Sequence, residues 1–116
     1  MGVRSDAFVC LKNLAHDEMP ERLKKMLKGG YGASVHLHPE GAAYVIEGVK
    51  WYVDEHQELR DLYAYLDTLG LEEYLVIVAC PDYPDSTEGD KGEWLDNPWG
   101  ACRVITVRIE FQSFSY

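Results

Sequence analysis

The sequence contains no long hydrophobic run. No stretch of the 116 residues approaches the roughly 18 to 20 uninterrupted apolar residues that a membrane helix requires. Residues 1–6 are not followed by the apolar block of a signal peptide. We therefore expect a cytoplasmic protein that has no membrane partner.

Cysteine is also scarce. The chain has three, Cys10, Cys80 and Cys102, and no two of them have the two-residue spacing of a zinc or redox motif. Each lies in a segment of β character. We expect free, mostly buried thiols in a reducing compartment.

The common catalytic motifs are absent as well. There is no nucleophile elbow, and the glycine-rich stretch 29–32 follows a predicted helix, whereas a phosphate-binding loop precedes one. The acids of residues 82–90 do not have the order of a calcium-binding EF-hand loop. We therefore expect no enzyme activity, no cofactor and no metal.

The sequence does contain enough apolar residues for one core. Hydrophobic residues make up 47% of the chain and aromatic residues 12%, as in an ordinary globular domain of this length. No repeat, low-complexity tract or linker divides it. We expect a single domain over 1–116.

The first half of the chain has the pattern of a strand, a helix and a hairpin. Residues 6–12 form a short apolar run, and residues 17–28 have apolar side chains at helical spacing, with Pro20 in the first turn. Residues 33–38 and 42–53 then form the two arms of a predicted β-hairpin. The hairpin turn is Pro39-Glu40-Gly41, Gly48 marks a bulge, and Trp51 is expected in the core.

The second half predicts a helix, a central strand, a long loop and a final strand. Asp54 is the expected cap of the helix, with Gln57 completing a capping box, and Gly70 ends it. Residues 73–80 are continuously apolar, as in a buried strand. Residues 81–101 contain many acids, prolines and glycines and are expected to form a long loop, and residues 102–111 alternate as a strand does.

The predicted order is therefore strand, helix, strand, strand, helix, strand, strand. Its first six elements match the β-α-β-β-α-β order of ferredoxin-like domains. We predict an α+β fold in which an antiparallel sheet carries two helices on one face. The additional C-terminal strand either joins an edge of the sheet or pairs with the fourth strand.

Negative charge is concentrated in one region. Residues 54–96 contain thirteen acids and two bases, a net charge of −11, whereas the rest of the chain has seven acids and nine bases. The whole formal net charge of −9 therefore originates on the second predicted helix and the long loop. Such a field repels nucleic acid and attracts basic surfaces.

Two interpretations of this acidic region are open. It either keeps the protein soluble or binds the basic surface of a host protein or nucleoprotein complex. Aromatic residues among the acids favour binding, because exposed Trp and Tyr side chains anchor many interfaces, although Trp94 and Trp99 can instead fold the loop back onto the sheet. The predicted partner-binding residues are Asp82, Tyr83, Asp85, Glu88, Asp90, Glu93, Trp94, Asp96 and Trp99 of the loop, with Glu58 and Asp61 of the helix.

Two alternatives involve the hairpin. His36 and His38 lie two residues apart on a predicted strand, so both project from one face beside Glu40. These residues are the candidates for a small metal-binding or ligand-binding domain or enzyme. A homodimer formed through an open sheet edge, either this strand or the final one, is the other possibility.

Two short segments resemble those of known phage proteins. Met1-Gly2-Val3-Arg4-Ser5 and Val49-Lys50-Trp51-Tyr52 are similar to stretches of small uncharacterised tailed-bacteriophage proteins, which begin Met-Gly-Tyr-Arg-Ser and carry a Val-Lys-Trp-Tyr segment. Val3 departs from the tyrosine of that group. The resemblance implies a phage or prophage gene whose product acts in the bacterial host cytoplasm, and it transfers no catalytic residue.

The resemblance also implies a class of partner. Small acidic phage proteins often inhibit host complexes whose working surfaces are basic, including CRISPR and other defence systems. We therefore expect an anti-CRISPR-like inhibitor that acts by protein binding.

Overall fold

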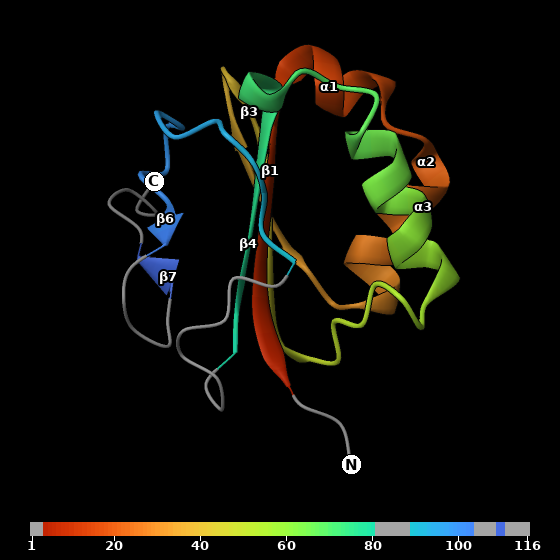
Figure 1. Ribbon diagram of the computed structural model, residues 1–116. Helices are drawn as coiled ribbons and strands as arrows, with labels where there is room; N and C mark the ends of the chain where they lie inside the picture. The colour runs from red at the N-terminus through yellow and green to blue at the C-terminus, as the bar shows by residue number, and fades with distance from the viewer. Residues whose placement is uncertain (1–3, 81–88, 104–108, 111–116) are drawn as a thin grey trace.

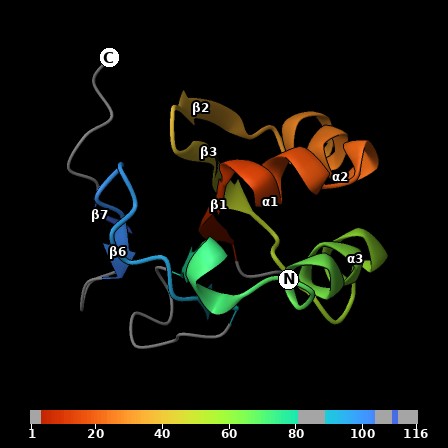
Figure 2. The same ribbon diagram turned by 90° about the horizontal axis from the view of Figure 1, so that it is seen from above.

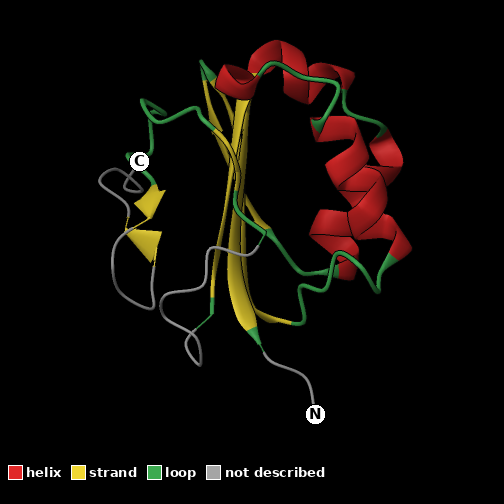
Figure 3. Ribbon diagram, in the orientation of Figure 1, coloured by secondary structure: helices red, strands yellow, loops and turns green. Residues whose placement is uncertain are grey.

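A five-stranded antiparallel sheet forms the centre of the molecule, seen in a computed structural model that describes residues 4–80, 89–103 and 109–110. The helices cover one face of this sheet (Figures 1 and 3). This arrangement confirms the predicted α+β class and the antiparallel sheet with its helices on one side. No helix of the described residues is long and apolar enough to cross a bilayer.

The strand order in the sheet is β2-β3-β1-β4-β5. The strands are β1 (Ser5–Lys12), β2 (Ser34–His38), β3 (Gly41–Val49), β4 (Tyr74–Ala79) and β5 (Lys91–Gly92). β1 lies between β3 and β4 and is antiparallel to both. The fifth strand, which pairs with β4, originates in the segment predicted to be a long loop.

The predicted hairpin is confirmed. His38 pairs with Gly41 across the two-residue turn, and the register continues without a shift to Ser34 opposite Val45. The predicted bulge at Gly48 is also present, because the pairing of β1 with β3 shifts there and Gly48 has φ +61°. Asp6 accepts a hydrogen bond from the Gly48 N–H at 2.9 Å, which holds the bulge.

The first predicted helix is broken. It begins earlier than predicted, as α1 (Asn13–Glu18), stops before Pro20, and restarts as α2 (Glu21–Lys25) and a π-helical turn, η1 (Met26–Gly30). Proline cannot continue a helix, because it has no N–H group to donate. It also disfavours helical geometry at the preceding residue, Met19. Pro20 is therefore the cap of α2, where its carbonyl accepts from Leu23 and Lys24.

The second helix, α3 (Gln57–Leu66), begins later than predicted. A turn takes up residues 52–56, in which the Tyr52 carbonyl accepts from the N–H groups of Glu55 and His56. His56 is the residue that precedes the helix, and no side chain caps it. The capping box of Asp54 and Gln57 is therefore wrong. A 3₁₀ turn, η2 (Leu71–Glu73), then leads into β4.

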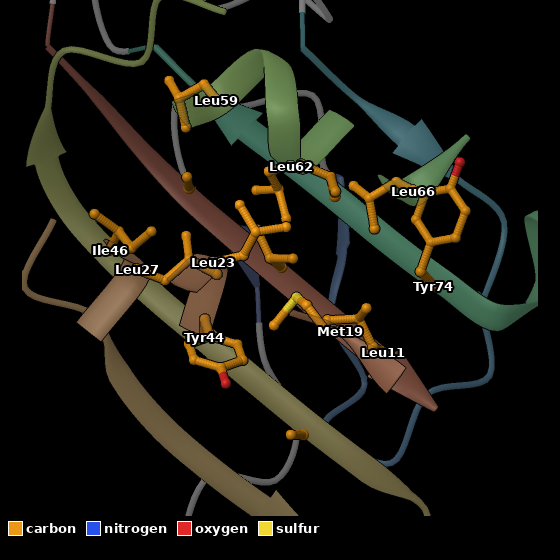
Figure 4. Close-up of a cluster of buried hydrophobic side chains, with 14 of the residues drawn as sticks. Leu11, Met19, Leu23, Leu27, Tyr44, Ile46, Leu59, Leu62, Leu66 and Tyr74 are labelled. Carbon is orange, nitrogen blue, oxygen red and sulfur yellow. The ribbon is translucent and has the colours of Figure 1, made fainter. Parts of the chain in front are cut away.

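The main core lies between the sheet and the helices. Leu59, Leu62 and Leu66 of α3 form its outer layer, and Leu11, Tyr44 and Tyr74 approach it from three strands (Figure 4). Each fully buried leucine stabilises the fold by about 1.5–3 kcal/mol. Trp51 is buried in this core, as predicted.

A second core lies on the opposite face of the sheet. Phe8, Cys10 and Ile77 project from the strands and are covered by Trp94, Trp99 and Ala101. The sheet is therefore covered on both faces, by helices on one side and by irregular chain on the other. Figure 1 shows β6 (Cys102–Arg103) and β7 (Ile109–Glu110) on this second side.

The predicted final strand over 102–111 is wrong. Within it β6 pairs with β7 in an antiparallel ladder, with Cys102 opposite Glu110, so the described ends of this segment are two strands and not one. This pair forms a separate two-stranded sheet and does not join the central one.

Candidate binding surface

The acids of α3 contact other parts of the fold. Asp61 pairs with Arg22 of α2 at 3.0 Å, and Glu58 accepts a hydrogen bond from the Tyr31 hydroxyl at 3.1 Å. A hydrogen bond from Gln57, together with Arg22, holds the pKa of Asp61 below its ordinary value. These two predicted partner-binding residues therefore tie α3 to the first helical segment.

Two acids near β5 are also used within the fold. Asp90 accepts the N–H of Val78 at 2.9 Å, a position that a neighbouring strand would otherwise occupy. Asp67 pairs with Lys91, and this interaction raises the pKa of the lysine. Asp90 was predicted to bind a partner, and in the structure its carboxylate closes the edge of β4.

A different set of acids lies at the end of the sheet where β1 ends and β4 begins. Glu72, Glu93 and Asp96, which we call the acidic rim, surround a shallow hollow of ≈ 340 Å³. All three are exposed, and none forms an ion pair with a described residue. Of the predicted partner-binding residues, Glu93 and Asp96 are thus brought together, and Glu72 was not predicted.

Lys12 and Trp94 also line this hollow. The Lys12 ammonium lies 5.7 Å from the centre of the Trp94 ring, within the range of a cation–π interaction. Leu95 completes the lining and is 70% exposed, and the neighbouring Leu71 is 51% exposed. The hollow therefore combines negative charge with exposed apolar side chains.

Backbone hydrogen bonds fix the position of the rim. The Glu93 N–H donates to the Leu71 carbonyl at 2.6 Å, and the Trp94 N–H donates to the Tyr74 carbonyl at 3.1 Å. These bonds attach the chain that follows β5 to η2 and to the first residue of β4. The rim carboxylates thus lie on chain that is anchored to the central sheet.

The two tryptophans are not exposed anchors. Trp94 is 3% exposed and Trp99 is fully buried, with their ring centres 5.9 Å apart in an edge-to-face arrangement. Of the two roles left open by the sequence, the fold supports the structural one. The Trp99 Nε1–H is buried and has no hydrogen-bond partner among the described residues.

Asn97 holds the turn that carries these tryptophans. Its side-chain amide donates to the carbonyls of Trp94 and Ala101, and its oxygen accepts the Ala101 N–H at 2.9 Å. The side chain is buried, so these bonds satisfy backbone groups that water does not reach. This role was not predictable from the sequence, because asparagine is common in exposed turns.

The remaining four predicted loop residues, Asp82, Tyr83, Asp85 and Glu88, lie outside the described residues.

The histidine pair of the hairpin has local partners. His38 Nδ1 accepts a hydrogen bond from the Glu40 backbone N–H at 3.0 Å, and its ring packs against Trp99 at 6.0 Å. No group of three metal-ligating side chains occurs among the described residues. His36, His38 and Glu40 are therefore not assembled with a further ligand in this part of the chain.

Cys10 and Cys80 are free thiols, as expected. Burial in the second core raises the pKa of the Cys10 thiol well above its ordinary value. Such a thiol stays protonated and has the character of a small apolar side chain.

No protein-family model, curated protein or solved structure matches the chain. The assignment of function therefore depends on the surface itself.

Proposed function

We propose that this protein binds another protein and is not an enzyme, and that the acidic rim with Leu71 and Leu95 is the surface that contacts the partner. The observation that carries this proposal is the division of the acids into two groups. Glu58, Asp61, Asp67 and Asp90 have partners within the fold, whereas Glu72, Glu93 and Asp96 have no ion-pair partner among the described residues.

Charge complementarity favours a basic protein surface as the partner. Three carboxylates that surround one hollow attract lysine and arginine side chains and repel the phosphates of nucleic acid. The exposed leucines beside them add apolar contact area that water-mediated charge pairing alone lacks. We therefore infer a partner surface on which arginine or lysine alternates with apolar side chains.

The phage resemblance suggests where such a partner is found. We propose a basic surface of a bacterial host protein or nucleoprotein complex, such as a CRISPR or another defence system, reached in the host cytoplasm. Blocking that surface would inhibit the complex without any chemical reaction.

A charge-reversal experiment tests the surface directly. The triple variant Glu72→Lys, Glu93→Lys, Asp96→Lys reverses the rim. The matched control Glu18→Lys, Glu47→Lys, Glu55→Lys makes the same change in net charge at three exposed acids elsewhere. The probe is a short fluorescent peptide of arginine and leucine. Its binding to each variant is measured by fluorescence anisotropy at moderate salt.

We expect the rim variant to bind the peptide at least about tenfold more weakly, since three screened charge pairs together contribute on the order of 1–2 kcal/mol. The control variant keeps most of the affinity. Equal losses in both variants would show that net charge alone attracts the peptide, and the proposal would be wrong.

The natural partner is identified by co-purification from a bacterial host. A partner that is retained by the wild type and by the control variant, but lost with the rim variant, supports the proposal. A partner retained equally by all three uses another surface.

A further inference from the structure

The two edges of the central sheet differ in how they are protected. The β5 edge is only two residues long. Beside it, the Val78 N–H donates a hydrogen bond to the Asp90 carboxylate, and Lys91 pairs with Asp67. Short strands, charged residues and capped backbone groups are common means by which proteins prevent edge-to-edge pairing.

Within the residues that the structure describes, the β2 edge has none of these devices. Its five residues, Ser34–His38, contain no proline, glycine, lysine or acid and pair with β3 without a bulge. Leu37 on this strand is 70% exposed. In the described part of the chain no strand lies on the outer side of β2.

The hairpin determines which backbone groups face outward. In a two-residue hairpin the pair next to the turn, here His38 and Gly41, is hydrogen-bonded, and bonding then alternates along the strand. Val35 and Leu37 therefore direct their N–H and C=O groups away from β3. Their side chains share the face of the sheet that the helices cover.

We propose that β2 pairs antiparallel with β2 of a second copy, around a two-fold axis beside His36. In this register Val35 of each copy lies opposite Leu37 of the other, which forms about four new backbone hydrogen bonds. The exposed leucine then packs against a valine. The result is one sheet that continues through both copies, with the helices of both on the same face.

The distribution of charge favours a second copy at this edge. In the strand order, β2 lies farthest from β4 and β5, next to which the acidic rim lies, and β2 itself contains no acid. Two copies that meet at β2 therefore keep their acidic rims apart. Figure 2 shows β2 at the margin of the sheet layer, with the helices to one side of it.

This inference is independent of the proposed function, because no residue of the acidic rim lies on β2. The test is the molar mass of the full chain across a range of concentrations, measured by sedimentation equilibrium. We expect a dimer for the wild type. Leu37→Lys should raise the dimer dissociation constant at least about tenfold, because charge on an edge opposes strand pairing.

Leu95→Lys is the matched control, since Leu95 is equally exposed but lies on the hollow. It should leave the dimer intact and weaken binding of the arginine–leucine peptide, and Leu37→Lys should do the reverse. A wild type that is monomeric at every concentration, or a dimer that Leu37→Lys leaves unchanged, overturns the inference.

A cross-link tests the register. The two His36 positions form a non-hydrogen-bonded pair with Cα atoms about 4.5 Å apart, a spacing that a disulfide spans. With Cys80 and Cys102 replaced by serine, His36→Cys should form a covalent dimer under mild oxidation. Ser34→Cys, which lies opposite His38 of the other copy, should not. Equal cross-linking of both variants contradicts this register.

Discussion

Arg22 of α2 donates to the carboxylate of Asp61 on α3 across 3.0 Å, and this contact joins two helices that the sequence separates by 39 positions. Both side chains are partly exposed, so solvent screens the pair. Asp61 was one of the acids predicted to bind a partner. Because Asp61 is already paired within the fold, net charge alone does not show which carboxylates are free to contact a partner.

Replacing Asp61 and Glu93 should therefore have different effects on stability. Asp61→Asn removes the partner of Arg22, so we expect a lower urea midpoint at neutral pH. Glu93→Gln removes a carboxylate without an ion-pair partner in the described chain, so we expect no loss. The measurement is urea unfolding of each variant beside the wild type.

The effect of Asp61→Asn should depend on pH in a defined direction. The pKa of Asp61 is lower in the folded protein than its ordinary value. The carboxylate thus contributes stability above its unfolded pKa, and this contribution is lost as the pH falls through the folded pKa. A difference from the wild type that persisted unchanged in strong acid would contradict this account.

The tryptophans allow a matched comparison of hydrogen bonding. Trp51 Nε1 donates to the Tyr63 hydroxyl at 3.1 Å, whereas Trp99 Nε1 is buried with no partner in the described part of the chain. Both indoles are buried, so Trp→Phe leaves a similar space at each. We expect Trp51→Phe to destabilise the protein by about 0.5–1.5 kcal/mol more than Trp99→Phe.

Urea unfolding of the two variants gives this difference directly. If Trp99→Phe is the more damaging change, then the Trp99 N–H has a partner in solution.

Alkaline pH should weaken the fold through its buried phenols. Burial raises the pKa of Tyr63 to about 12, and that of Tyr31 and Tyr44 to about 12 as well. An unfolded tyrosine loses its proton near pH 10, as a rough reference value. The folded state therefore keeps protons that the unfolded state has released.

The stability that these protonated tyrosines contribute is therefore fully present below about pH 10, and it is lost as the pH rises toward about 12. In Tyr63→Phe the fall should be smaller, because one of the five described tyrosine hydroxyls whose pKa is raised by burial is gone. Unfolding free energies measured at several alkaline pH values test this. If Tyr63→Phe leaves the slope of unfolding free energy against pH unchanged, then Tyr63 does not cause the loss of stability.

Local patterns in the sequence were sufficient for the hairpin and the central strand. Alternation and a two-residue turn determine β2 and β3, and a continuously apolar run determines β4. Such signals lie within a few residues of the structure that they specify. For the same reason the stripe of α3, Leu59, Leu62 and Leu66, was predictable.

The first helical segment and the loop were less predictable because distant contacts decide them. Pro20 is compatible with either the first turn of a helix or its cap, and the packing of α1 over the sheet selects the second. Likewise nothing near Trp94 in the sequence indicates that it packs against Gly41, where an added Cβ would lie 3.0 Å from the indole.

Part of the candidate site was predictable from the sequence. A count of charged residues located the acidic region, and Glu93 and Asp96 were among the residues predicted to bind a partner. Glu72 was missed because it precedes a strand and is separated from Glu93 by 20 residues of chain, so only the pairing of β5 with β4 brings the two together.

In the turn from Trp94 to Trp99, the side chains that fix the backbone differ from those that are exposed to solvent. The two indoles and Asn97 are buried and fix the backbone, whereas Leu95 and Asp96 between them are exposed. Substitutions at these two positions should therefore cost little folding stability, because neither side chain is part of the buried frame. Under the proposed function, this turn allows the contact surface to vary between related proteins while the residues that hold its backbone stay the same.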